Sequence, residues 1–161
     1  MVVRASTGHA VAACEIALTY AGRRTQFGRP IARTQLVQAK LVERPGEVSA
    51  MQLYCIRLGR LIDEGTMTET MAASAKYFCS VKARHVRRLA RDVLGGNGIT
   101  LDFHVIRHLC DVEALVTYEG TAEIQTLVVG RQVTGHRAFA CALAKTPATS
   151  AIVPGILGAH G

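Results

Sequence analysis

The sequence predicts an all-α protein, an antiparallel four-helix bundle, and three observations support that prediction. Apolar residues recur at helical spacing in four stretches, no stretch shows the alternation of a half-buried strand, and the connections are short. The 161 residues fit one domain, and 49% hydrophobic with 19% charged residues is typical of a globular chain. Because there is no tryptophan and there are only four tyrosines and four phenylalanines, the core must be mainly aliphatic.

The first two helices are predicted from their apolar spacing. The first is expected to end near Arg24, before a turn at residues 27–30. Its buried stripe consists of small and aliphatic side chains: Ala10, Cys14, Ala17, Leu18 and Ala21. The second runs from about Thr34 to Ile62. We expect Pro45-Gly46 to interrupt it, because proline removes a backbone donor and clashes with the preceding turn.

The third and fourth helices have clearer boundaries. Residues 66–69, Thr-Met-Thr-Glu, form a capping box that begins the third helix, and Gly95-Gly96 ends it. Residues 97–120 are expected to be mainly loop, with one short helical piece near 106–110. The last helix runs from Thr121, a good N-cap, to about Val133.

Composition limits the possible partners and compartments. A net charge of +7 suits an acidic partner such as nucleic acid, a membrane surface or a phosphate-rich ligand. The five cysteines are scattered without a Cys-x-x-Cys pair, so we expect reduced, mostly buried thiols rather than a zinc ribbon. No signal peptide or membrane-length apolar stretch is visible, so a soluble protein of the cytoplasm, or of the mitochondrial matrix in a eukaryote, is expected.

The turn at residues 118–121, Tyr-Glu-Gly-Thr, is the strongest candidate for a catalytic site. Gly120 lets the backbone turn tightly and approach a ligand, and the turn places Glu119 at the start of a helix. Partial burial there would raise the pKa of Glu119 above its ordinary value of about 4.3 and make it a general base. The alternative is a solvent-facing glutamate that interacts favourably with the helix dipole.

Four stretches in the same order resemble the acyl-CoA dehydrogenase family. Residues 21–31 contain its Arg-x-x-Phe-Gly pattern, residues 94–99 its glycine loop, residues 115–121 its catalytic turn, and residues 129–131 part of the following helix. Within the family, residues 104–108, 113–114 and 130–135 are most similar to glutaryl-CoA dehydrogenase.

The resemblance implies a reaction at this turn. Glu119 would abstract the α-proton of an acyl-CoA thioester while the β-hydrogen leaves as hydride to FAD. Gly120 would contact the acyl group. With glutaryl-CoA as substrate, decarboxylation to crotonyl-CoA would follow, and electrons would pass to electron-transfer flavoprotein.

The resemblance also implies a set of cofactor-binding residues: Arg24, Phe27, Gln35, Asp92, Val93, Leu94, Gly95, Gly96, Thr121 and Phe139. Arg24 would bind the pyrophosphate, where its planar fork suits phosphate oxygens. The alternative for Arg24 is a solvated cation at the end of a helix. The alternative for Phe27 is a residue of the hydrophobic core. In the family, Arg24, Gln35 and the 92–96 loop contact a flavin across a subunit boundary, which implies a homo-oligomer, a tetramer.

The sequence supports two other kinds of site, a metal site and a nucleic-acid-binding surface, less well. His104 and His108 share a helix face, but Val105 stands where the zinc-protease motif needs glutamate, so no metal site is expected. Basic residues at 82–91 form a cluster without interleaved aromatic residues, which disfavours nucleic acid. Because that cluster leads into the glycine loop, we expect it either to be solvated or to attract phosphates.

The resemblance covers residues 1–140, the family's C-terminal helical domain, and implies that the N-terminal helical and middle β-domains of full-length members are absent. Residues 141–161 are expected to form a loosely ordered tail. The chain would therefore be an oxidoreductase acting on a CH–CH bond only when the missing domains complete it. A fragment, a split gene product, and a remnant that serves as a non-catalytic oligomerisation module all remain open.

Overall fold

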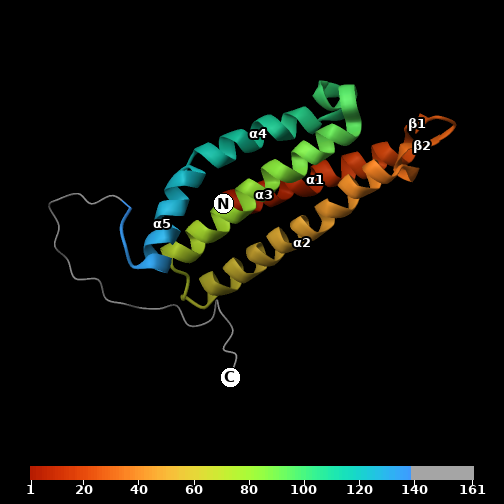
Figure 1. Ribbon diagram of the computed structural model, residues 1–161. Helices are drawn as coiled ribbons and strands as arrows, with labels where there is room; N and C mark the ends of the chain where they lie inside the picture. Colours follow the sequence, from red (N-terminus) through yellow and green to blue (C-terminus); the bar gives the residue numbers. More distant parts are fainter. Residues whose placement is uncertain (139–161) are drawn as a thin grey trace.

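The computed structural model describes residues 1–138, which are mostly helical (Figure 1). The five α-helices are α1 (Val2–Arg23), α2 (Gln35–Asp63), α3 (Glu69–Leu94), α4 (Val105–Thr117) and α5 (Ala122–Thr134). The antiparallel strands β1 (Thr25–Gln26) and β2 (Arg29–Pro30) form a small hairpin, and 3₁₀ turns cover Ile31–Arg33, Gly95–Ile99 and Leu101–Phe103. Phe139 and Cys141 lie outside the described residues.

Helices α1 to α4 run alternately up and down as an antiparallel bundle, and α5 lies across one end (Figure 1). The all-α bundle predicted from the sequence is therefore confirmed. Its fourth member is α4, however, and not the last helix of the chain. The prediction that residues 97–120 are mainly loop was wrong.

The sequence predicted only a short helical piece, near 106–110, within α4, and the reason lies at the start of the helix. Its N-cap is His104, which has φ of 59° and makes no side-chain capping bond. The sequence therefore lacks the usual helix-start signal. Tertiary packing forms the helix instead, because Val105, Val112, Leu115 and Val116 are buried against the bundle.

The core is centred on α3, which packs against every other α-helix. Where α3 meets α1, small side chains allow the two helices to approach closely. The fully buried alanines of this contact are Ala10, Ala13 and Ala17 on α1 and Ala83 and Ala90 on α3. The core is mainly aliphatic, as predicted, but Leu18 is 62% exposed. The expectation of mostly buried thiols was wrong for the described residues, because only Cys79 is buried, Cys14 and Cys55 are partly buried, and Cys110 is exposed.

Helix α2 continues through Pro45, so the predicted interruption was wrong. Proline inside a helix costs about 3 kcal/mol, which packing can offset. Arg44, directly before the proline, and Met51, after it, are both buried against the bundle. Pro45 itself is exposed. Contacts on both sides of the proline therefore hold one continuous helix.

The start of α3 is shifted from the predicted capping box. Thr68, not Thr66, is the N-cap, and its side chain accepts a hydrogen bond from the backbone N–H of Met71 at 3.3 Å. The end of α3 is as expected, because Gly95 stops the helix with φ of 59°, a conformation suited to glycine.

Gly98 allows the glycine loop to pack against α3. A Cβ at this position would lie 2.5 Å from the backbone oxygen of Arg91, whereas a Cβ on Gly96 would meet nothing within 4 Å. Neither glycine has a positive φ. We expect Gly98→Ala to lower the free energy of unfolding by about 1–3 kcal/mol, because a backbone contact cannot move aside.

Gly96→Ala is the matched control and should change the free energy of unfolding by less than about 0.5 kcal/mol. Urea unfolding followed by circular dichroism measures both. Equal effects of the two substitutions would contradict the close approach at Gly98.

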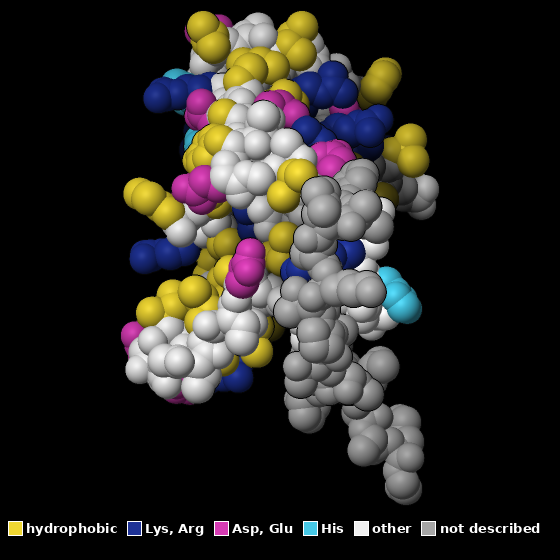
Figure 2. Space-filling model, turned by 90° about the vertical axis from the view of Figure 1, so that its left-hand side faces the viewer, with side chains coloured by type: hydrophobic (Ala, Val, Ile, Leu, Met, Phe, Trp, Pro, Cys, Tyr) yellow, Lys and Arg dark blue, Asp and Glu magenta, His cyan; other side chains and the backbone are white. Residues whose placement is uncertain are grey.

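Several large hydrophobic side chains remain exposed in residues 1–138. Those on α2 are Leu36, Val42, Leu53, Ile56 and Ile62. Others lie at the end of the molecule that carries α5, where hydrophobic side chains are visible among charged ones (Figure 2). No helix in the described part of the chain is both long and apolar enough to span a membrane.

Candidate active site

The turn between α4 and α5 places Glu119 at one end of the bundle. Glu119 and Gly120 both have positive φ, 55° and 86°. Thr121 is the N-cap of α5, as predicted, and accepts a 3.5 Å hydrogen bond from the N–H of Ile124. Positive φ is unusual for a non-glycine residue and, at Glu119, indicates a backbone held by its surroundings.

Lys76 of α3 holds this turn through its ammonium group. Its ammonium donates hydrogen bonds to the carbonyl oxygens of Tyr118, at 2.7 Å, and Gly120. Lys76 is only 7% exposed, and burial lowers its pKa, an effect that nearby Glu119 opposes. A buried lysine needs such partners, because an unpaired buried charge is very unfavourable.

Gln125 of α5 completes the support of the turn. Its Nε2 donates to the carbonyl oxygens of Glu119, at 3.0 Å, and Gly120, at 3.2 Å. A Cβ on Gly120 would lie 2.6 Å from that Nε2, so the glycine leaves room for the amide. Two buried side chains therefore bind three successive carbonyl groups of the turn.

Lys76 and Gln125 hold the candidate catalytic turn, and sequence reasoning missed both. One signal was present for Lys76: with Ala73, Ser80, Ala83 and Arg87 it forms a buried stripe at helical spacing, where a lysine is unusual. Nothing in the sequence identifies the partner of Gln125, because its hydrogen bonds depend on the unusual backbone at Glu119.

The carboxylate of Glu119 faces solvent in this chain. The side chain of Glu119 is exposed, so residues 1–138 do not supply the partial burial expected for a general base. Hydrogen bonds from Lys76 and Gln125 fix the backbone of the turn, while the carboxylate of Glu119 stays accessible to solvent. Such an arrangement lets a carboxylate meet a ligand that arrives from outside this chain.

Several of the predicted cofactor-binding residues lie together at the other end of the bundle. Arg24, which follows α1, and the loop from Asp92 to Gly96 line one hollow of about 370 Å³, together with Tyr20 and Asn97. The amide of Asn97 donates to the Tyr20 hydroxyl at 2.9 Å and so ties the loop to α1. Arg91 pairs with Asp92 of the loop, so its charge is already compensated. Among the residues that line the hollow, the cation is Arg24.

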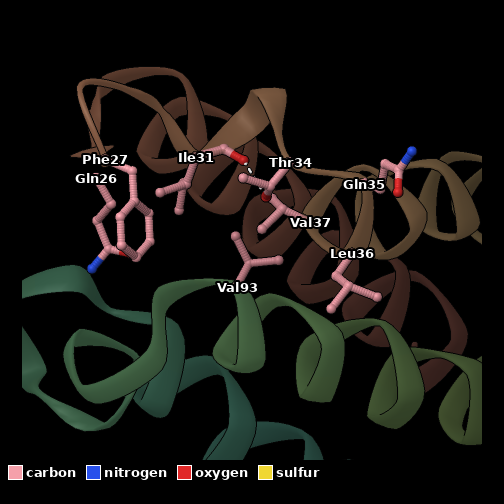
Figure 3. A pocket seen from close by; sticks show the side chains of 8 residues that line it. All are labelled: Gln26, Phe27, Ile31, Thr34, Gln35, Leu36, Val37 and Val93. Carbon is pink, nitrogen blue, oxygen red and sulfur yellow. Dashed lines mark hydrogen bonds between the residues drawn. The ribbon is translucent and has the colours of Figure 1, made fainter.

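A second hollow, of about 450 Å³, lies between the hairpin, α2 and the end of α3 (Figure 3). Val93 points up from α3 towards Ile31 and Val37, and Phe27 stands at one side. Phe27 is 96% exposed and has φ of 52°, so it is not a core residue. Gln35 lies at the rim with its amide directed away from Val93. This hollow presents apolar side chains suited to a flat ring system.

These two regions are far apart within one chain. Lys76, under the Glu119 turn, and Val93, in both hollows, lie on the same helix, seventeen residues apart. At 1.5 Å per residue the separation is about 25 Å. The structure therefore brings Arg24, Phe27, Gln35 and the 92–96 loop together at one end, and Glu119, Gly120 and Thr121 at the other.

The basic cluster at residues 82–91 makes mainly contacts with other helices of the chain. Lys82 pairs with Glu47 at 2.6 Å, His85 contacts Glu43 at 2.7 Å, and Arg84 pairs with Glu113. Arg87 is fully buried, and burial lowers its pKa to about 10. Most of these charges therefore hold α3 against α2 and α4.

Residues 1–134 match the profile of the family described as acyl-CoA dehydrogenase, C-terminal domain. The chain therefore belongs to the acyl-CoA dehydrogenase family. The family predicted from the sequence is confirmed.

Individual relatives agree with this assignment. The chain is similar to a glutaryl-CoA dehydrogenase from Mycobacterium smegmatis, with 39% identity, a TM-score of 0.81 and coverage of 84% of this chain and 35% of that one. A second such structure, in complex with FADH2, has 33% identity, a TM-score of 0.83 and coverage of 86% and 36%. A 3-(aryl)acrylate reductase from Clostridium sporogenes (strain ATCC 15579) is 35% identical over 122 residues, 76% of this chain and 32% of that protein. The chain thus spans about a third of the length of these relatives.

Proposed function

We propose that this chain is the base-carrying C-terminal domain of an FAD-dependent acyl-CoA dehydrogenase whose substrate is glutaryl-CoA. The observation that carries the proposal is the Glu119 turn, in which Lys76 and Gln125 bind three successive carbonyls while the carboxylate stays accessible. The similarity to glutaryl-CoA dehydrogenases supports the choice of substrate.

Glu119 acts as the general base in this proposal. Its carboxylate takes the α-proton of the thioester, and the rigid turn keeps it in one position relative to the acyl chain. FAD, when bound, supplies the acceptor for the β-hydrogen. A substrate that covers Glu119 would also remove water from the carboxylate.

The residues at the opposite end fit a flavin dinucleotide. Arg24 faces the 92–96 loop across a hollow, where a guanidinium suits a pyrophosphate. Phe27 and Val93 border an apolar hollow beside it. Since about 25 Å separates this end from Glu119, these residues and Glu119 serve different copies of the cofactor. The active enzyme is therefore a homo-oligomer. We also propose that electron-transfer flavoprotein accepts its electrons.

A domain exchange tests the proposal. The part of the Mycobacterium smegmatis glutaryl-CoA dehydrogenase that matches this chain is replaced by the 161-residue chain, and the hybrid is purified and assayed. We expect a yellow, oligomeric protein that oxidises glutaryl-CoA. A hybrid that folds and binds FAD but does not oxidise glutaryl-CoA would contradict the proposal.

A second candidate is a non-catalytic oligomerisation module, which the exposed hydrophobic side chains of α2 favour. A well-folded hybrid that assembles without binding FAD would support this alternative. The same result would reject the flavin site assigned to Arg24 and the glycine loop.

A further inference from the structure

A cluster of possible metal ligands lies between α1 and α4. It consists of His9 on α1 and of His108 and Asp111 on α4, whose ligand atoms all lie within 4.8 Å of one another. The two Nδ1 atoms are 2.9 Å apart, and the rings meet edge to face. The histidines are half-buried, and Asp111 is exposed. The sequence drew attention to His104 with His108, but His104 is not a member of this cluster.

The fold holds these three side chains in place. His108 and Asp111 are three residues apart on one helix and therefore share a face. Arg87 of α3 is fully buried and donates to the carbonyl oxygens of His108, at 2.6 Å, and Leu109, at 2.9 Å. This contact anchors α4 at the position of the cluster. His9 reaches it from α1, which packs directly against α4.

The spacing suits one transition-metal ion. Two nitrogens that each lie about 2.0–2.1 Å from a zinc ion are about 3.3 Å apart at a tetrahedral angle and about 2.9 Å apart at a right angle. The observed 2.9 Å falls at the lower end of that range. Two imidazoles and one carboxylate are a common ligand set for zinc and for other divalent transition metals.

We propose that His9, His108 and Asp111 bind a divalent transition-metal ion of the zinc class and thereby connect α1 to α4. Solvent completes the coordination, because Asp111 is exposed. Two nearby cations, Arg87 and Arg107, act on the cluster electrostatically and oppose the charge of the metal. The site therefore binds more weakly than a structural zinc site with four protein ligands.

The competing explanation is a direct hydrogen bond between the two imidazoles, which needs no metal. That bond involves only the histidines, whereas a metal site also uses the carboxylate of Asp111. The substitution Asp111→Asn therefore separates the two explanations, because it keeps the shape of the side chain and leaves the pair of histidines intact.

Calorimetric titration of the untagged 161-residue chain with zinc chloride at pH 7.5 tests the proposal. At this pH, above the ordinary histidine pKa of about 6.5, both rings are mainly neutral and able to bind metal. We expect one zinc ion per chain. His9→Ala, His108→Ala and Asp111→Asn should each weaken binding at least about tenfold, since even residues that only orient a ligand have effects of that size.

His136→Ala is the matched control, because His136 is an exposed histidine outside the cluster. It should bind zinc like the wild-type chain. Circular dichroism without metal confirms that each variant is folded. An absence of zinc binding, or equal affinity in wild type and Asp111→Asn, would overturn the proposal. Neither result would bear on the proposed dehydrogenase activity.

Discussion

Glu119→Gln is expected to lower kcat for glutaryl-CoA about 10²–10⁴-fold in the hybrid enzyme. Glutamine has the same shape but cannot accept the α-proton, and general-base catalysis contributes a factor of this size. The hydrogen bonds that hold the turn go to backbone carbonyls, so they survive the substitution. FAD content and KM should therefore change little.

Glu123→Gln provides the matched control for steady-state assays. Glu123 is an exposed glutamate in the first turn of α5, four residues beyond the proposed base. It should retain wild-type kcat. If both variants lose activity equally, or neither does, Glu119 is not the base.

Lys76→Met is expected to lower the free energy of unfolding by about 2 kcal/mol. A hydrogen bond to a charged group contributes about 1.5–3 kcal/mol, and Lys76 makes two to the turn. Removing the unfavourable burial of its charge offsets part of that loss. Methionine is similar in size, so the effect reflects the lost bonds rather than a cavity. Urea unfolding of the 161-residue chain measures it.

The same substitution should lower kcat of the hybrid, because a displaced turn misplaces the base. A shift of about 1 Å can cost about 10²-fold in rate. Lys82→Met, on the same helix, removes a partly exposed ion pair with Glu47 and the contact of the ammonium with the Phe78 ring, 5.8 Å from its centre. It should cost about 1 kcal/mol with no effect on kcat. A Lys76→Met variant as stable and active as Lys82→Met would contradict the role of Lys76 as a positioning residue.

Helical periodicity predicted α1, although its N-cap makes no side-chain hydrogen bond. Periodicity together with capping residues predicted α3 and α5, whose N-caps are threonines with side-chain hydrogen bonds. Thr121 and Gly135, for example, cap α5 at its two ends. The continuity of α2 through Pro45 and the full length of α4, beyond the short helical piece expected near 106–110, could not be predicted in this way. Both depend on packing between segments distant in the sequence, which overrides local preference.

The candidate site was predictable in part. Glu119, Gly120 and Thr121 share one turn, and Arg24 shares a hollow with the 92–96 loop. The roles that the sequence resemblance implied for these residues stay predictions. The contacts of Lys76 join residues 42 and 44 positions apart, and His9 meets His108 across 99 positions. Such pairs have no local signature in a single sequence.

The most direct test of Glu119 as the base is a single-turnover measurement. The hybrid enzyme is mixed anaerobically with glutaryl-CoA, and the flavin absorbance is followed in the wild-type and Glu119→Gln forms. We predict rapid bleaching in the wild type and little or none in Glu119→Gln with an equal amount of bound FAD. Equal bleaching in both forms would contradict the assignment of Glu119 as the base.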